Sequence, residues 1–319
     1  MVKLNEYQNG NVQVMMFSDG TKIREYSGVP SPVHPESIDI KITNWCDAGC
    51  TYCHESSTTR GVHADVAVVR HMIDGLPPGV ELAIGGGDPF SHPAIATILQ
   101  EISDRGLIAN ITVNGKHIYR HYDAIHDFRN RGLIYGLGIS FAAGMYECYD
   151  DYFDEVSDQL GRPRNLSDIV DDRTIVHFIA GEHSPKEVFE LMRVHPKILV
   201  LGYKNFGRGV RHNGPRVNHL LGAWRYWIGS MISRGVVCFD NLALEQLQVQ
   251  KWLPTDLWEK FYMGDDGSFT MYADAIRGEY ALKSTAVQRE SCAGLTAMQY
   301  FQKNRVGATA TAKELRVIY

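Results

Sequence analysis

From Ile38 onward the sequence alternates short apolar runs with amphipathic helical patterns, and this alternation restricts the fold more than any other feature. Six runs rich in β-branched residues predict strands at residues 38–42, 80–84, 108–113, 133–140, 174–179 and 198–201. Strands that alternate with helices are typical of right-handed βαβ units and a parallel sheet. The sequence therefore predicts an α/β fold, a partial (βα)6 TIM-like barrel, with its chemistry at the carboxyl ends of the strands.

Start and stop signals frame the predicted helices. Ser91 is a candidate N-cap for one helix, and Gly106 can end it. Ser184 and Pro185 open a second helix in the same way. An amphipathic pattern after the sixth strand predicts a third helix that extends to about Ser233.

Segments at both ends lie outside the alternating region. Two apolar runs flank Ser18-Asp19-Gly20 and predict an N-terminal hairpin, because Asp-Gly is a strong turn signal. We expect three parts: residues 1–35 form a β-hairpin and linker, residues 36–240 form the barrel, and residues 241–319 form a C-terminal extension over the barrel mouth.

Composition and charge exclude several classes of protein. The chain is 44% hydrophobic and 22% charged, which is typical of a globular protein rather than a disordered one. A net charge of −5 lacks the basic character of general nucleic-acid or anionic-membrane binding. No apolar run approaches the roughly 20 residues of a membrane-spanning helix, and the N-terminus has no apolar signal segment. We therefore expect a cytoplasmic protein that does not associate with membranes.

Three of the six cysteines lie within eight residues, just after the first predicted strand, in Cys46-Asp47-Ala48-Gly49-Cys50-Thr51-Tyr52-Cys53. Six cysteines are too few for a disulfide scaffold in a chain of 319 residues. Closely spaced thiols indicate metal binding or redox chemistry instead. Three thiolates can hold three irons of a four-iron cluster and leave the fourth iron open for catalysis.

Other interpretations of this segment stay open. Cys50-Thr51-Tyr52-Cys53-His54 matches the C-x-x-C-H pattern of haem attachment, although that attachment is usually made outside the cytoplasm. The three cysteines with His54 also match a Cys3His zinc site. Buried structural cysteines are a further alternative, but the intervening glycine and polar residues make poor core.

A glycine-rich segment, Gly85-Gly86-Gly87-Asp88-Pro89-Phe90, stands at the end of the second predicted strand. Glycines let a ligand approach the backbone closely, and exposed carbonyls there can accept hydrogen bonds from an ammonium group. A flexible strand-to-helix turn is the alternative. The position matches that of the cysteine segment, which also follows a strand, and this favours a shared binding site.

Together the two segments resemble the radical S-adenosylmethionine (SAM) enzyme superfamily, over about residues 36–240. That superfamily is marked by C-x3-C-x2-C after the first strand and Gly-Gly-Glu/Asp-Pro after the second, and Asp88 stands here where glutamate is common. The resemblance implies a [4Fe-4S] cluster on Cys46, Cys50 and Cys53, whose open iron is chelated by the amine and carboxylate of SAM. It also implies reductive cleavage of SAM to a 5′-deoxyadenosyl radical that abstracts hydrogen from the substrate, with a flavodoxin- or ferredoxin-type electron donor.

The resemblance further implies which residues contact SAM. We expect the amino group at residues 85–88, the adenine at the backbone of Tyr52, the ribose near Asn114, and the ribose or carboxylate near Ser140. Asn114 before a glycine is also typical of a turn, and Ser140 could equally cap a strand end.

Candidate substrate contacts come from three places in the sequence: His177, Lys204, Arg208, Tyr272 and Asp274. The loop after the sixth strand is cationic and could hold a carboxylate or phosphate, or could simply be a solvated loop. The histidine in the fifth strand could equally be a packed core residue. The C-terminal extension is rich in aromatic residues, and we expect it to close the active site against water.

The remaining cysteines, Cys148, Cys238 and Cys292, leave a second cluster open. Ser291-Cys292-Ala293-Gly294 resembles the opening of SPASM or twitch extensions, which carry auxiliary iron–sulfur clusters, but no cysteine follows it. The sequence thus predicts a radical SAM enzyme acting on a peptide or other small organic substrate. Radical modification of a nucleoside or phosphorylated small molecule is one alternative. A non-catalytic zinc-binding interaction protein is another.

Overall fold

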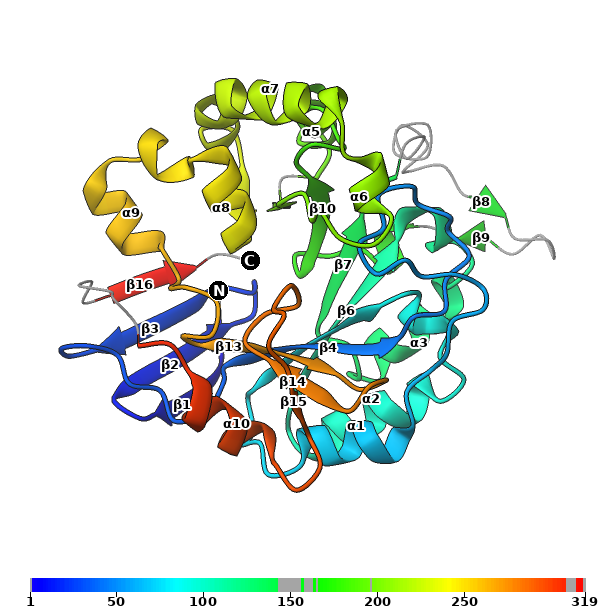
Figure 1. Ribbon diagram of the computed structural model, residues 1–319, viewed down its shortest axis with the longest axis vertical. Coiled ribbons are helices and arrows are strands. Elements are labelled where there is room, and N and C mark those ends of the chain that lie inside the picture. The colour runs from blue at the N-terminus through cyan, green and yellow to red at the C-terminus, as the bar shows by residue number, and fades with distance from the viewer. Residues whose placement is uncertain are drawn as a thin grey trace. The chain divides into compact units, whose positions relative to one another are not determined.

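A mixed α/β fold with a large parallel sheet is seen in the computed structural model (Figure 1), which describes residues 2–142, 156–157, 163–164, 166–195, 197–307 and 314–317. The chain divides into two units. The first comprises Met1–Gly49, Glu55–Ile111 and Leu253–Tyr319, and the second comprises Cys50–His54 and Thr112–Trp252. Closure of the sheet into a partial barrel and the expected boundaries at residues 35 and 240 stay predictions.

The sheet of the first unit combines three of the six predicted strands with strands from the C-terminal extension. Its strands are, in spatial order, β6 (Ile108–Asn114, of which the first unit holds the amino-terminal half), β5 (Glu81–Gly86), β4 (Ser37–Thr43), β13 (Thr270–Asp274), β14 (Glu279–Ala281) and β15 (Glu290–Ser291). Strands β6, β5, β4 and β13 are parallel, whereas β14 and β15 are antiparallel additions. The C-terminal extension therefore contributes a parallel neighbour to the first predicted strand.

The two faces of this sheet differ in polarity because successive side chains of a strand point to opposite faces. Ile38, Ile40 and Ile42 of β4 are buried, on the face that carries helices α1 (Val66–Ile73) and α2 (Ile95–Asp104), which lie side by side in Figure 1. The opposite face carries polar and small residues, and we call it the inner face. It comprises Asp39, Lys41, Ala83, Gly85, Tyr272, Asp274, Glu279 and Ala281.

The start of α2 differs from the prediction. The helix begins at Ile95 after Ala94, and Pro89–Ser91 form the short 3-10 helix η1. The Ser91 hydroxyl donates to Oδ2 of Asp88 at 2.7 Å instead of capping α2. The predicted N-cap was wrong because the Asp88 carboxylate uses the hydroxyl, and the chain makes a separate turn before the helix.

The second unit contains the remaining predicted strands. Its parallel strands are β7 (Gly136–Ser140), β10 (Thr174–Ile179), β11 (Lys197–Leu201) and β12 (Val236–Phe239). Its helices are α3 (Tyr122–Asn130), α5 (Pro185–Leu191), α6 (Gly209–His212), α7 (Pro215–Ile232) and α8 (Asn241–Leu247). Its short elements are η2 (Gly115–His117), β8 (Val156–Ser157), β9 (Pro163–Arg164), η3 (Leu166–Asp168) and η4 (Val249–Trp252).

Two of the helix signals in this unit are confirmed. Ser184 and Glu187 form a capping box at the start of α5, in which each side chain accepts a backbone N–H of the other residue. Helix α7 ends at Ile232 with Ser233 as its C-cap. Helices α5 and α7 pack against each other at the top of Figure 1.

The N-terminal hairpin is confirmed as β2 (Val12–Phe17) and β3 (Lys22–Tyr26), but it is part of a larger antiparallel sheet. Strand β1 (Lys3–Asn9) pairs with β2, and β16 (Glu314–Val317) pairs with β3. The first unit also contains helices α9 (Thr255–Phe261) and α10 (Ala297–Asn304). The polar sequence of β1 gave no strand signal, because most of its side chains are exposed.

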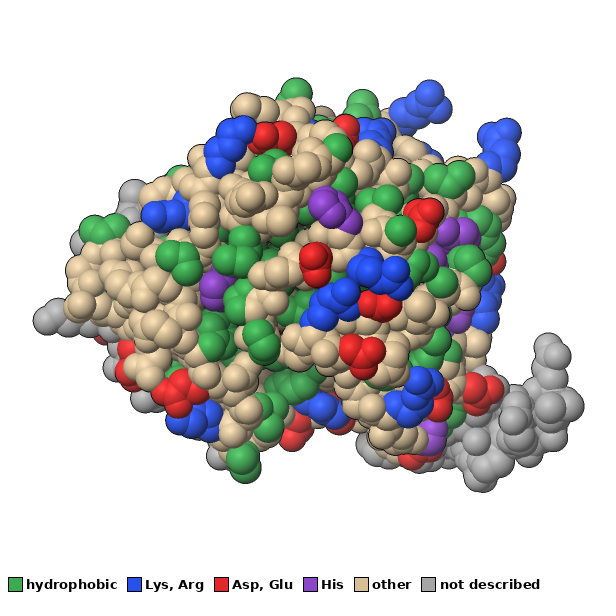
Figure 2. Space-filling model, turned by 90° about the horizontal axis from the view of Figure 1, so that it is seen from below, with side chains coloured by type: hydrophobic (Ala, Val, Ile, Leu, Met, Phe, Trp, Pro, Cys, Tyr) green, Lys and Arg blue, Asp and Glu red, His purple; other side chains and the backbone are tan. Residues whose placement is uncertain are grey.

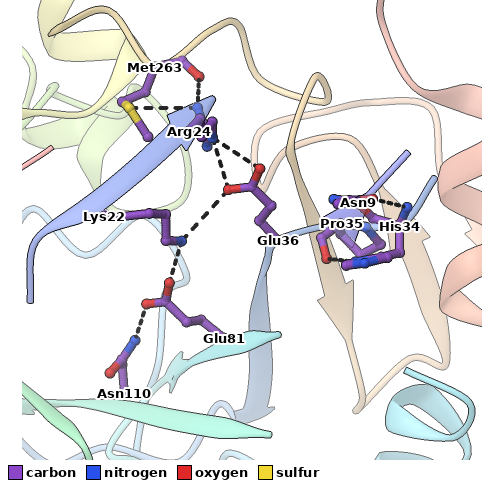
Figure 3. A network of polar contacts seen from close by, with 9 residues as sticks. All are labelled: Asn9, Lys22, Arg24, His34, Pro35, Glu36, Glu81, Asn110 and Met263. Atoms are coloured by element: carbon purple, nitrogen blue, oxygen red, sulfur yellow. Dashed lines mark hydrogen bonds and ion pairs between the residues drawn. The ribbon is translucent and has the colours of Figure 1, made fainter. Parts of the chain in front are cut away.

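Buried ion pairs join this small sheet to the amino-terminal ends of β4 and β5 (Figure 3). Nε of Arg24 lies 3.0 and 2.9 Å from the two carboxylate oxygens of Glu36, which precedes β4 and is 0% exposed. The guanidinium also donates to the backbone oxygen of Met263 at 2.8 Å and lies 3.8 Å from the centre of the Phe269 ring. Both side chains of this guanidinium–carboxylate contact are thus almost completely shielded from water, which makes the pair costly to break.

Lys22 extends the network to the inner face of the sheet. Its ammonium contacts a carboxylate oxygen of Glu81, the first residue of β5, and lies 3.9 Å from Glu36. The other carboxylate oxygen of Glu81 accepts a hydrogen bond from Nδ2 of Asn110 at 2.9 Å (Figure 3). The amino-terminal end of the inner face is therefore filled by paired charges.

Basic, acidic and hydrophobic side chains are mixed on the face shown in Figure 2. Neither charge dominates there, in keeping with the small net charge of −5. In the part of the chain that the structure describes, no helix has the length and hydropathy needed to cross a membrane.

We expect Glu36→Gln to lower the free energy of unfolding by about 3 kcal/mol, since it leaves a buried guanidinium without its counter-charge. The measurement is urea unfolding followed by tryptophan fluorescence. Asp266→Asn is the control, because Asp266 pairs at 3.7 Å with Lys283 and both side chains are more than a third exposed. Equal losses in the two variants would contradict a stabilising role for the buried network.

Candidate functional site

The loop after β4 carries the three clustered cysteines, and its first part belongs to the first unit. Cys46, Cys50 and Cys53 are half-buried thiols that form no disulfide. The backbone N–H of Cys46 donates to the carbonyl of Thr58 at 3.0 Å, which fixes the start of the loop. The N–H of Ala48 points to Sγ of Cys46 at 3.5 Å. Hydrogen bonds to a cysteine sulfur stabilise the thiolate, the form that binds a metal.

The second part of the loop, with Cys50 and Cys53, belongs to the second unit. The N–H of Cys53 donates to the carbonyl of Cys50 at 3.3 Å, which makes a tight turn between the two thiols. Nδ2 of Asn114, at the end of β6, lies 3.6 Å from Sγ of Cys50, while its Oδ1 accepts the N–H of Lys116. Asn114 is thus the turn residue and a polar neighbour of Cys50, while its contact with SAM stays a prediction.

Arg208 holds the same turn from the other side. Its backbone N–H donates to the carbonyl of Cys53 at 3.0 Å, and its Nε donates to the carbonyl of Cys50 at 2.9 Å. The sequence predicts Arg208 as a substrate contact, and that role stays a prediction. The observed contacts make it a support of the cysteine loop. Lys204 lies in the turn before it, where its carbonyl accepts the N–H of Phe206 at 2.9 Å.

Tyr52 lies among aromatic rings. Its ring meets those of His183 and His212 edge to face, with centroids 6.1 and 6.0 Å apart. Burial raises the pKa of Tyr52 above its usual range, and it lowers the pKa of His183 to about 4. His183 is therefore neutral near pH 7, and its Nδ1 accepts the N–H of Ile179 at 2.9 Å. This packing fixes the backbone of Tyr52, which is the part expected to contact adenine.

The glycine turn after β5 packs directly on the start of the cysteine loop. The N–H of Gly87 donates to the carbonyl of Thr43 at 2.7 Å, and the N–H of Asp88 donates to the carbonyl of Trp45 at 2.8 Å. Both contacts lie within the first unit. The two motifs are therefore joined by backbone hydrogen bonds on the residues that precede Cys46.

The three glycines of this turn have different physical roles. A Cβ at Gly86, where φ is +118°, would lie 2.1 Å from the carbonyl oxygen of Thr43. A Cβ at Gly87 would lie 2.1 Å from the carbonyl oxygen of Trp45, whereas a Cβ at Gly85 would meet nothing within 4 Å. Gly86 and Gly87 thus allow close packing on the loop, and only Gly85 leaves open space for a ligand.

A buried charge cluster lies on the inner face of the first unit. Nζ of Lys41 contacts the carboxylate of Glu55, which follows the cysteine loop, and lies 3.5 Å from Oδ2 of Asp274. Oδ1 of Asp274 accepts the N–H groups of Ile276 and Arg277 at 3.1 and 3.2 Å. Asp274 is 2% exposed, so its observed role is to hold the turn after β13 and to balance Lys41. Its expected contact with substrate stays a prediction.

Tyr272 lies beside this cluster on β13. Burial raises the pKa of its phenol above the usual range, and the charges of Glu55 and Asp274 raise it further. The guanidinium of Arg289 lies 5.0 Å from the centre of the Tyr272 ring and opposes that increase. Tyr272 is therefore an uncharged hydrogen-bonding group near neutral pH.

Two predicted residues, Ser140 and His177, lie on neighbouring strands of the second unit. They are register partners at the ends of β7 and β10. A Cβ at Gly138 would lie 2.5 Å from Cε1 of His177, so the imidazole rests on the backbone of β7. Burial lowers the pKa of His177 to about 4, which makes it a neutral group. Their contacts with SAM and substrate stay predictions.

Two of the isolated cysteines, Cys238 and Cys292, lie within the described residues. Burial raises the pKa of Cys238 to about 11, and it also raises the pKa of Cys292. Both are therefore protonated thiols near neutral pH, the form that binds metals poorly. Cys148 lies outside the described residues.

Several residues near these groups carry no motif and were not predicted: Lys41, Glu55, Glu279 and Arg289. The last two lie in β14 and directly before β15, strands that the sequence did not predict. An alternation of polar with apolar residues along β4, which places Asp39 and Lys41 on one face, is the one signal that could have found Lys41.

Comparison with known proteins gives one family and one fold. Residues 40–160 match the model of the Radical SAM superfamily. No curated protein matches the chain. Among solved structures, the chain is similar to Streptococcus suis SuiB bound to its precursor peptide SuiA, with a TM-score of 0.50 and 11% identity over 88% of this chain and 64% of that one. SuiB bound to S-adenosylmethionine gives a TM-score of 0.49 and 12% identity over 82% and 64% of the two chains. The chain thus spans 64% of the length of SuiB, and the likeness concerns the fold.

We expect Gly87→Ala to lower the midpoint of thermal unfolding by several degrees, the size of effect that a loss of about 1–3 kcal/mol produces. The added methyl group would clash with the backbone of Trp45. Gly85→Ala is the matched control, because its methyl group enters open space and should leave the midpoint nearly unchanged. A larger loss for Gly85→Ala than for Gly87→Ala would contradict the assigned roles.

We expect Arg208→Ala to raise the rate at which iodoacetamide modifies Cys50 and Cys53 in the metal-free protein by about threefold to tenfold. Losing the hydrogen bond from Nε to the carbonyl of Cys50 should let this turn open more often. Arg211→Ala is the control, because Arg211 is exposed on α6. The rates are measured by mass spectrometry, and equal rates in both variants would refute the support role of Arg208.

Proposed function

Because residues 40–160 belong to the radical SAM superfamily, we propose that this enzyme cleaves SAM reductively and abstracts hydrogen from a peptide or other small organic substrate. The superfamily uses a [4Fe-4S] cluster and SAM as cofactors. The observation that carries the proposal is the pairing of the two motifs, since the glycine turn donates two backbone hydrogen bonds to the residues just before Cys46.

The donor set fits an iron–sulfur cluster. Cys46, Cys50 and Cys53 are thiols on one short loop, and soft thiolate ligands suit iron. We propose that they hold three irons, while the fourth iron takes the amine and carboxylate of SAM. N–H groups of Ala48 and Asn114 directed at two of the sulfurs would lower the charge density on the thiolates.

The protein itself binds and orients SAM. Gly85 offers backbone next to open space, which suits an ammonium group that needs carbonyl acceptors. The backbone of Tyr52, held between two histidine rings, suits the adenine. Asn114 and Ser140 end strands of the second unit and are proposed to meet the ribose or carboxylate.

When bound, the cluster and SAM together supply the electron transfer and the radical that removes a hydrogen atom from the substrate. The chain must hold the substrate and keep water away from the reacting atoms. We assign these tasks in part to Tyr272, Asp274 and His177, which are uncharged or charge-balanced by their surroundings. A flavodoxin- or ferredoxin-type protein is the proposed electron donor.

A peptide is one substrate class that the fold likeness supports, since SuiB has been solved with its precursor peptide SuiA. The cationic loop that includes Arg208 is the sequence feature that favours a nucleoside or phosphorylated substrate. Because Arg208 is engaged by the carbonyls of Cys50 and Cys53, that support is weaker.

We expect Cys46→Ala, Cys50→Ala and Cys53→Ala each to abolish the release of 5′-deoxyadenosine from SAM after anaerobic reconstitution and reduction with dithionite. The loop changes while the buried core does not, so the circular dichroism spectrum should be preserved. Cys238→Ala is the matched control and should keep cleaving SAM, because its buried thiol is protonated.

Two results would contradict the proposal. One is SAM cleavage that persists in any of the three loop variants. The other is a wild-type protein that binds zinc stoichiometrically and fails to bind SAM, which would favour a zinc-binding interaction protein instead.

A further inference from the structure

Strand register places a row of side chains across the inner face of the first unit. Asp39 of β4 stands opposite Tyr272 of β13, and Tyr272 stands opposite Ala281 of β14. The pairing of Tyr280 with Glu290 brings the preceding residue, Arg289, beside Ala281 on the same face. Ala281 is small, so the Arg289 side chain can reach across it to the Tyr272 ring.

Arg289 lacks a charged partner in this row. Its Nη2 donates to the carbonyl of Ser284 at 2.7 Å, but its Nη1 is buried and has no hydrogen-bond partner. Among the residues that the structure describes, no carboxylate lies within ion-pair distance of this guanidinium. A buried donor nitrogen without an acceptor is unfavourable, and a guanidinium fork matches a carboxylate in shape.

Glu279 lies in the next row along the strands, and it has an acceptor atom without a partner where Arg289 has a donor atom without one. It stands between Asp274 of β13 and Ser291 of β15 in the register. Its Oε2 is buried without a hydrogen-bond partner, and no cation pairs with it within the described ranges. The neighbouring cation, Lys41, is already held by Glu55 and Asp274.

The two incompletely satisfied groups are diagonal neighbours on one face. Glu279 faces Ser291 and Arg289 faces Ala281, so the positions are offset by two residues, and such neighbours lie about 7 Å apart. They nevertheless form no ion pair with each other. One buried donor atom, Nη1 of Arg289, and one buried acceptor atom, Oε2 of Glu279, thus lie at neighbouring positions without a hydrogen-bond partner.

We infer that Arg289 and Glu279 form a subsite for the zwitterionic end of an amino acid, with the carboxylate on Arg289 and the ammonium on Glu279. This assignment rests on the proposed function and names the substrate class as a free amino acid or a small molecule with an amino-acid end. Tyr272 lies under the guanidinium and holds it in place through its ring.

The surrounding charges favour a zwitterion over a simple anion. The carboxylates of Asp39, Asp274, Glu279 and the neighbouring Glu55 outnumber the cations Lys41 and Arg289, so the net negative charge would repel a dianion such as phosphate. A ligand with both charges satisfies Arg289 without adding net negative charge. It also gives the Glu279 carboxylate the cation that it lacks.

The test measures binding of three probes to the anaerobic, cluster-loaded enzyme saturated with SAM, by ligand-detected NMR. The probes are L-alanine, propionate, which lacks the ammonium, and ethylamine, which lacks the carboxylate. We expect L-alanine to bind at least about tenfold more tightly than either fragment.

Arg289→Gln and Glu279→Gln should each weaken L-alanine binding by about tenfold or more, and Arg289→Lys, which keeps the charge but loses the fork, should weaken it less. Lys283→Gln, in the exposed loop before Arg289, is the matched control and should have no effect.

Specific outcomes overturn the inference. Equal binding of propionate and L-alanine, or unchanged L-alanine binding in folded Arg289→Gln, would do so. Competition between SAM and L-alanine would also overturn it, because the subsite would then hold the amino-acid end of SAM.

Release of 5′-deoxyadenosine by the wild-type enzyme is measured separately. Its absence would refute the proposed function alone, whereas its presence without L-alanine binding would refute only the subsite.

Discussion

The side chains of a β-strand alternate between two faces, and the first unit depends on how the sequence uses that alternation. Isoleucines at 38, 40 and 42 face the helices, while Asp39 and Lys41 between them face the other way. One face of the sheet therefore packs against the helices, and the other face carries polar side chains. The buried pair of Arg24 and Glu36 and the contact of Lys22 with Glu81 fill the amino-terminal end of that second face. Toward the carboxyl ends of β4, β5 and β13 the same face carries Lys41, Gly85 and Asp274.

The glycine turn and the cysteine loop support each other at that end. Backbone N–H groups of Gly87 and Asp88 donate to carbonyls of Thr43 and Trp45, so the position of one motif constrains the other. Neither contact involves a side chain, and a Cβ at Gly86 or Gly87 would lie 2.1 Å from a carbonyl oxygen, which explains the two glycines. The acidic side chain accepts a hydrogen bond from Ser91 and thereby orders the start of the following helix segment.

Structural features that depend on residues close together in the sequence could be predicted. The six central strands, the hairpin around Asp19-Gly20 and the helix start at Ser184-Pro185 follow from local patterns, and the structure confirms them. The contacts of Arg208 with Cys50 and Cys53, and the register of β13 beside β4, join residues far apart in the chain. No local pattern encodes such a pairing, so these contacts could not be predicted. Ser91 failed as an N-cap for a related reason, since a neighbouring carboxylate competes for its hydroxyl.

The pairing of β13 with β4 has a consequence for synthesis of the chain. Ser37 pairs with Thr270, so one edge of β4 has no strand beside it until most of the polypeptide has left the ribosome. An unpaired strand edge with isoleucines at alternate positions is a template for pairing with other chains. Contacts between such distant segments also form slowly. During synthesis this edge of β4 therefore adds to the aggregation risk of the nascent chain, and pairing with β13 removes that exposure.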